Sequence, residues 1–130
     1  MAIIPPVPCD QLETNKFQTR MELAQELLVP DTLFLQIMAH APGYAEALFD
    51  AMYQSHALGN VDHCLKEIIR IRLARLAKDD YFGTLRSKKA YDLGLSEARI
   101  EAGCGDFETD TQFSAAEKWA LNYAKLMYTQ

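Results

Sequence analysis

The longest apolar segment, residues 62–78, constrains the fold of this chain more than any other feature. It reads DHCLKEIIRIRLARLAK, and its large apolar residues recur at the 3.6-residue spacing of a helix. One stripe is made of Leu65, Ile68, Ile69, Leu73 and Leu76, and a second side carries Ile71 and Ala74. A helix that is apolar on two sides is central to its domain, or packs against its own core and another subunit. The segment therefore predicts a central helix and a homo-oligomer.

The remaining sequence also has residues typical of helix starts and ends, and it has no strand pattern or repeat. Asp62 suits the N-cap of the central helix, Asp31 opens a short helix, and Pro42 suits the first turn of the next. Ser114 and Glu117 form a capping box for the last helix, which reaches residue 128. Further helices are predicted at 19–28 and from residue 96, a loop at 103–110, and an extended proline-rich arm over residues 1–10.

Asp79 and Asp80 interrupt the apolar run and predict the start of a second helix. Its apolar face would comprise Phe82, Leu85, Ala90 and Leu93, and Gly94 would end it. Two helices joined this closely form a hairpin. We therefore expect an all-α fold, in one domain spanning residues 1–130, built around a central helix hairpin.

Composition narrows the possible functions. The chain has 130 residues and a net charge of -5, which argues against binding nucleic acid because phosphate binding depends on clustered Lys and Arg. No apolar stretch is long enough to span a membrane, and the N-terminus lacks a basic signal-peptide region. Three cysteines without a CxxC motif indicate neither disulfides nor zinc, and the three histidines lack metal-ligand spacing. We expect a cytoplasmic protein without a metal, its histidines at helix ends or on the surface.

Residues 65–95, LKEIIRIRLARLAKDDYFGTLRSKKAYDLGL, resemble the core helix pair of the carboxymuconolactone decarboxylase family, which includes alkyl hydroperoxidase D. The peroxidase branch has a Glu, the two cysteines of a CxxC motif, a His and a terminating Gly at fixed spacing. Glu67, Asp79, Phe82, Arg86 and Gly94 occupy those places without an insertion. The resemblance implies an all-α fold that assembles into trimers or hexamers.

The departures from the family pattern bear on activity. Peroxidase chemistry there needs an attacking thiolate and a resolving thiol, and neither Asp79 nor Phe82 can provide them. Arg86 replaces a His that the decarboxylase branch also carries, and a guanidinium cannot serve as a general base. We therefore expect a family variant without the redox CxxC, which is not a CxxC peroxidase and uses no cofactor.

Three hypotheses for function remain. In the first, Glu67, Asp79 and Arg86 converge in a pocket with Tyr81 and Phe82, which binds or transforms a small anionic or aromatic molecule. Arg86 would hold the anionic group, and Glu67 would act as acid or base. In the second, the same three charged residues form an ion-pair network in a catalytically degenerate structural oligomer, since a buried Arg ordinarily requires a carboxylate partner.

The third hypothesis is a thiol peroxidase, with alkyl hydroperoxide reductase-like activity, that uses Cys64. This residue lies two positions after the N-cap Asp62, and helix N-termini lower the pKa of a thiol. The competing interpretation of Cys64 is a small buried apolar side chain, which is the usual environment of a free cysteine. Replacing Cys64 by Ser and measuring peroxide turnover separates the two.

Overall fold

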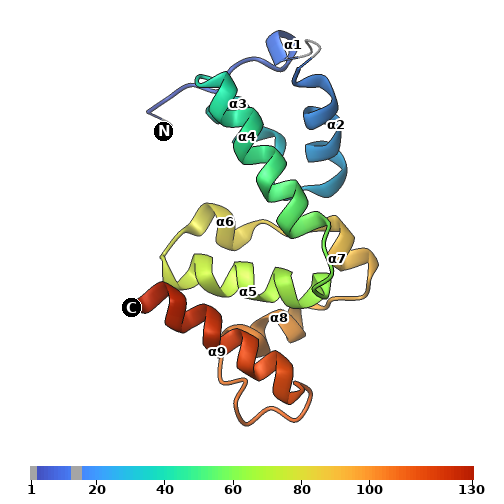
Figure 1. Ribbon diagram of the computed structural model, residues 1–130, viewed down its shortest axis with the longest axis vertical. Helices are drawn as coiled ribbons and strands as arrows, with labels where there is room; N and C mark the ends of the chain where they lie inside the picture. The colour runs from blue at the N-terminus through green and yellow to red at the C-terminus, as the bar shows by residue number, and fades with distance from the viewer. Residues whose placement is uncertain (1–2, 13–15) are drawn as a thin grey trace. The chain divides into compact units, whose positions relative to one another are not determined.

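The computed structural model describes residues 3–12 and 16–130, and its regular structure there is helical, with no strand in this part of the chain (Figure 1). The all-α prediction is confirmed. The chain forms two compact units, Met1–Asn60 and Val61–Gln130. The expected single domain and the arrangement of the proposed family remain predictions. Among the described residues, no helix combines the length and apolarity needed to cross a bilayer.

The described residues of unit 1 form four α-helices and a π-helical turn. They are α1 (Cys9–Leu12), α2 (Gln18–Leu27), α3 (Thr32–Met38), α4 (Pro42–Met52) and the turn Tyr53–Ala57. The Asp31 side chain accepts a hydrogen bond from Phe34 N at 3.0 Å, and Pro42 lies in the first turn of α4, as the sequence predicts. The core is formed by Leu12, Phe17, Met21, Ala24, Leu35, Ala39, Ala45 and Phe49.

The N-terminal arm lies along α3. Val7 N donates to Gln36 O at 3.0 Å, and the Gln36 side-chain amide donates back to Val7 O at 2.9 Å. His40 Nε2 lies 2.7 Å from Pro5 O. Residues 3–8 are non-helical, but α1 begins at Cys9, so the arm is shorter than the predicted residues 1–10. Its first two residues lie outside the described part of the chain.

Unit 2 is organised around α5 (His63–Leu76). This helix packs against α6 (Asp80–Thr84), α7 (Lys88–Asp92), α8 (Glu97–Cys104) and α9 (Ala115–Thr129), as Figure 1 shows. Asp62 caps α5 by accepting from Leu65 N at 2.8 Å, Ser96 caps α8, and Ser114 with Glu117 forms the predicted capping box of α9. The core comprises Ile68, Ile71, Ala90, Leu95, Ile100, Phe107, Phe113 and Leu121.

The buried face of α5 differs from the predicted main stripe. The stripe residue Leu76 is exposed and three others are half-buried, whereas the buried residues are His63, Glu67, Ile68, Ile71, Arg72 and Ala74. Arg72 faces inward because its guanidinium donates to the carbonyls of Gly103 and Cys104 at the end of α8.

Gly103 lies inside α8, not in the predicted loop, and a Cβ there would meet Ile68 Cγ2 at 2.3 Å. The absent side chain lets the two helices approach each other.

The second arm of the predicted hairpin is two short helices instead of one. The backbone is extended at Leu85 (φ -64°, ψ 146°) and at Ser87 (φ -68°, ψ 122°), between α6 and α7. Ser87 caps α7 by accepting from Ala90 N at 3.3 Å. The carbonyls of Phe82 and Leu85 accept from Arg70 instead of from helical amides. Local capping and a tertiary contact together break the helix. They place Arg86 in the link between α6 and α7, residues 85–87.

Candidate functional site

Glu67 is a fully buried carboxylate on α5 whose oxygens are all engaged. Arg70 donates to it twice, from Nε at 2.9 Å and from Nη2 at 2.7 Å. Ser87 N donates to Oε1 at 2.9 Å. Arg70 also donates to the carbonyls of Phe82 and Leu85, at 2.5 and 2.7 Å. Glu67 and Arg70 therefore attach the link between α6 and α7 to the side of α5.

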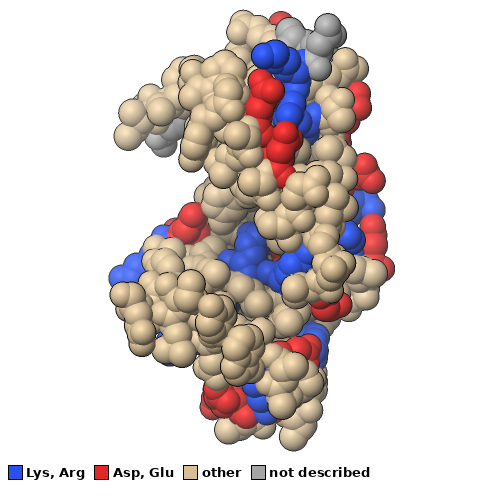
Figure 2. All heavy atoms as spheres, in the orientation of Figure 1, with Lys and Arg blue, Asp and Glu red and all other residues tan. Residues whose placement is uncertain are grey.

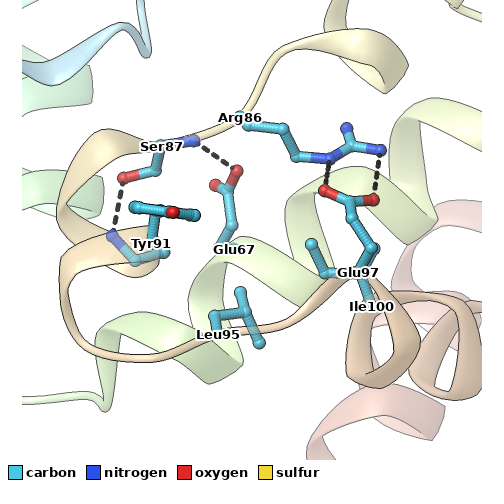
Figure 3. A pocket seen from close by; sticks show the side chains of 8 residues that line it. Glu67, Arg86, Ser87, Tyr91, Leu95, Glu97 and Ile100 are labelled. Atoms are coloured by element: carbon cyan, nitrogen blue, oxygen red, sulfur yellow. Dashed lines mark hydrogen bonds and ion pairs between the residues drawn. The ribbon is translucent and has the colours of Figure 1, made fainter.

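Arg86 forms a separate ion pair. Its Nε and Nη2 donate to the Glu97 carboxylate at 2.7 and 3.2 Å, and its Nη1 donates to the carbonyls of Gly83 and Leu85. Figure 3 shows the Arg86 side chain extending away from Glu67 towards Glu97. Both side chains of this pair are substantially exposed, 33% for Arg86 and 63% for Glu97. Arg86 is thus an ion-paired residue near the surface of unit 2.

The structure does not bring Glu67, Asp79 and Arg86 together around one space. Asp79 accepts from Phe82 N at 3.0 Å as the N-cap of α6, so its main contact is with its own helix. The predicted shared helical face of Asp79 and Arg86 does not form, because α6 ends before Arg86. Arg86 borders one space with Glu67 and a different one with Asp79.

The space beside Glu67 is a small cavity of about 30 Å³. Its walls are formed by Glu67, Arg86, Ser87, Ala90, Tyr91, Leu95, Glu97 and Ile100 (Figure 3). Pockets that bind organic ligands have volumes of about 300–1,000 Å³. A cavity of this size suits one or two water molecules. It leaves no room for a substrate beside the Glu67 carboxylate.

The second space is a hollow of about 340 Å³, which we call the α5–α6 hollow. Its lining residues are Arg75, Lys78, Asp79, Asp80, Gly83, Thr84 and Arg86. Arg75 forms a double hydrogen bond with Glu101, at 2.9 and 2.5 Å, and this bond lowers the pKa of Glu101 and raises that of Arg75. The hollow has the size of a ligand site and contains three cationic side chains and two carboxylates.

Comparisons with protein-family models, curated proteins and solved structures give no match for this chain. The family resemblance of residues 65–95 therefore remains a prediction. The site is interpreted from its own geometry.

Tyr81 and Phe82, the other predicted pocket residues, line neither of these two spaces. Their rings make an edge contact with centroids 5.1 Å apart. Phe82 is half-buried, and Tyr81 is only just exposed. No aromatic side chain lines the α5–α6 hollow.

Cys64 is half-buried, and its surroundings favour the protonated thiol. Burial raises the pKa of Cys64, and the nearby carboxylate of Asp62 raises it further, whereas Arg99 acts in the opposite direction. A nucleophilic cysteine needs a lowered pKa, because the thiolate is the reactive form. Burial raises the pKa of Cys104 as well. Neither environment provides the activation that the peroxidase hypothesis requires.

Two residues of this region, Arg70 and Ser87, do not figure in the sequence-based prediction, and a third, His63, differs from it in burial. Arg70 is the actual partner of Glu67, and the signal was present as an i, i+3 Glu–Arg pair on one helix. For Ser87 the sequence signal was weaker, because it was only a serine three residues before Ala90, at the spacing of a helix cap. His63 was expected at a helix end or on the surface. It begins α5 but is buried, with Nε2 2.8 Å from Ser87 Oγ.

No group of three or more potential metal ligands gathers in residues 3–12 and 16–130. The Ser87 hydroxyl contacts His63 but also caps α7, and the Ser87 side chain is almost fully buried. Contacts of this kind stabilise the fold. The α5–α6 hollow is therefore the candidate functional site of unit 2.

Proposed function

We propose that this chain binds a small anionic molecule in the α5–α6 hollow, without a cofactor, and that Arg75, Lys78 and Arg86 anchor the anion. The observation that carries the proposal is the ligand-sized space beside Arg86, of about 340 Å³. The cavity beside Glu67, at about 30 Å³, supports no corresponding role for that carboxylate. The proposal therefore keeps Arg86 from the sequence-based hypothesis and replaces Glu67 by Arg75 and Lys78.

The two arginines can change partners at low cost. Glu97 and Glu101, which pair with them, have side chains exposed by 63% and 58%. Exposed ion pairs contribute only about 0–1 kcal/mol, so a ligand that forms two parallel hydrogen bonds with a guanidinium can displace them. Carboxylates have the required planar geometry.

The acidic side chains of the hollow limit the charge of the ligand. Asp79 and Asp80 would repel a polyphosphate, while Lys78 and the arginines would still hold a single carboxylate. The lining contains no aromatic residue. A small aliphatic carboxylate is the ligand class that fits this combination.

The same proposal includes membership of the carboxymuconolactone decarboxylase family, as a variant without the CxxC motif. It is supported by the all-helical structure and by the positions of Glu67, Asp79, Phe82 and Arg86 in the sequence.

A second candidate, the catalytically degenerate structural protein, is favoured by the complete pairing of Glu67. In that case the hollow would bind no ligand.

The test is calorimetric titration with acetate, succinate, benzoate, phosphate and pyrophosphate at constant ionic strength. We expect a small aliphatic carboxylate to bind the wild type, and Arg86→Ala and Lys78→Ala each to weaken binding. Loss of one charge-assisted hydrogen bond costs roughly 1.5–3 kcal/mol, which is about a 10- to 150-fold weaker affinity. The affinity of Arg86→Lys for the carboxylate should lie between those of wild type and Arg86→Ala, because lysine keeps the charge but lacks the planar guanidinium.

Arg99→Ala is the matched control. Arg99 also pairs with a glutamate, Glu117 at 2.7 Å, but it does not line the hollow. This variant should bind the carboxylate as the wild type does. Binding that is equally weak in Arg99→Ala, or absence of binding by the wild type to every compound, would contradict the proposal and favour the structural candidate.

A further inference from the structure

Helix α9 presents an apolar face that nothing in its own unit covers. Leu121 points into the core and is fully buried. On the opposite side, Trp119 is 66% exposed, Tyr123 49%, Leu126 52% and Met127 67%. These four residues follow each other at spacings of four, three and one, so they share one side of the helix. We call this side the α9 face.

The α9 face carries no charge. Its remaining positions are Ala116 and Ala120, whereas the charged residues of the helix, Glu117, Lys118 and Lys125, lie on other sides. In Figure 2 the surface over α9 is largely free of acidic and basic side chains. The Trp119 and Tyr123 rings stack with centroids 5.1 Å apart and planes 8° from parallel. A contiguous exposed apolar patch of a few hundred square ångströms is often a functional interaction surface.

We propose that a second copy of this chain covers the α9 face, in an antiparallel pairing with a two-fold axis at Tyr123. The sequence of the face is self-complementary about this residue. Trp119 lies four positions before Tyr123 and Met127 four positions after it, so each Trp119 meets the Met127 of the other copy. Ala120 and Leu126 are likewise equidistant, which places a small side chain opposite a large one. In an antiparallel pairing about Tyr123, positions equally far before and after this residue face each other, because the same patch is used by both copies.

The area of the face is sufficient for a weak dimer. Four large side chains exposed by half to two thirds present roughly 500 Å² per copy, since a large aromatic side chain covers about 150–250 Å². Pairing two copies then buries about 1,000 Å² in total, the lower limit for a specific interface. We expect dissociation in the micromolar range at this size.

The two-fold axis constrains larger assemblies. A hexamer built from two stacked trimers contains two-fold axes and accommodates the α9 pairing, whereas an isolated trimer contains none. Of the two assemblies that the family resemblance implies, the α9 face is compatible with the hexamer. The inference does not depend on the ligand proposed for the α5–α6 hollow.

Sedimentation velocity over a concentration series tests the pairing. The wild type should shift from monomer to dimer or hexamer as its concentration rises through the micromolar range. Tyr123→Glu places two carboxylates against each other on the axis and should remain monomeric, or trimeric if a separate three-fold contact exists. Tyr44→Glu is the matched control, because Tyr44 is a 60% exposed tyrosine on α4, and this variant should associate as the wild type does.

Cysteine crosslinking tests the register in a Cys9→Ser background, which removes the exposed native thiol. Under mild oxidation, Tyr123→Cys should link to its own copy, because only a residue on the axis faces itself. Trp119→Cys should link far more efficiently to Met127→Cys than to itself. A wild type that stays monomeric, an association unaffected by Tyr123→Glu, or crosslinking that does not depend on position would overturn the proposal.

Discussion

Two glutamate–arginine pairs of unit 2 have the same chemistry in opposite surroundings. In the Glu67–Arg70 pair the side chains are 1% and 15% exposed, whereas in the Glu97–Arg86 pair they are 63% and 33% exposed. The buried pair also binds Ser87 N, the Phe82 carbonyl in α6 and the Leu85 carbonyl in the α6–α7 link. Burial makes the first pair costly to break, and solvent makes the second easy to exchange. Glu67 thus helps to hold the fold of unit 2, while Arg86 remains partly exposed to solvent.

The most severe way to test this contrast is to remove the carboxylate from each pair. Glu67→Ala leaves Arg70 partly buried without its counter-charge and should lower the free energy of unfolding by about 3–5 kcal/mol. Glu97→Ala should lower it by no more than about 1 kcal/mol. Urea denaturation followed by circular dichroism measures both.

Glu67→Gln keeps an acceptor for Ser87 N, so it should be less destabilised than Glu67→Ala and remains measurable if the alanine variant fails to fold. If Glu67→Ala and Glu97→Ala lose similar free energies, the two pairs do not differ as we describe. The same conclusion follows if the loss in Glu67→Gln is as small as that in Glu97→Ala.

A change in the apolar contact between α5 and α8 should have an intermediate effect. Gly103→Ala brings a Cβ to 2.3 Å from Ile68 Cγ2, and overpacking of this kind costs about 1–3 kcal/mol of folding free energy. The loss should not depend on salt, because no charge is altered. Gly43→Ala is the matched control, since its added methyl meets nothing within 4 Å and lies in a helix, where alanine is favoured by about 0.5–1 kcal/mol. Thermal unfolding shows whether each variant is stabilised or destabilised. A stabilised Gly103→Ala would refute the close approach of α5 and α8.

The smallest effect is expected at the second exposed pair, Arg75–Glu101. Arg75 lowers the pKa of Glu101 in the folded state, so the pair stabilises the fold above the ordinary Glu pKa of about 4.3. That contribution disappears as the pH falls through the lowered pKa. Glu101→Gln should therefore be less stable than wild type near neutral pH by under about 1 kcal/mol.

Denaturation curves at several pH values and two salt concentrations measure this difference. The two proteins should converge in acid, and high salt should reduce the gap at neutral pH. A gap that persists in strong acid, or that grows with salt, would show that Glu101 acts through something other than its charge.

The helix starts were predictable because their chemistry is local. Asp31, Asp62 and Ser114 each accept a hydrogen bond from an amide three residues later, and a capping residue with its spacing is visible in the sequence. The all-helical class followed from the same signals and from apolar periodicity.

The arrangement of the charged residues was not predictable in the same way. Asp79 as a cap was visible, but the pairing of Arg86 with Glu97 depends on the break between α6 and α7. That break depends in turn on Arg70 reaching backbone carbonyls 12 and 15 residues away. Partner choice over such distances is a tertiary property. The burial of His63 at the first residue of α5 has the same origin, since it rests on a contact with Ser87.

The Arg70 contacts determine how freely this region can change its sequence. Arg70 binds the carbonyls of Phe82 and Leu85, and every amino acid supplies a carbonyl. The side chains at those two positions can therefore be exchanged without loss of the attachment. Glu67 and Arg70 have no such freedom, because replacing either removes the counter-charge of the other. Variation is thus tolerated in the attached segment and restricted to joint replacement in the pair that holds it.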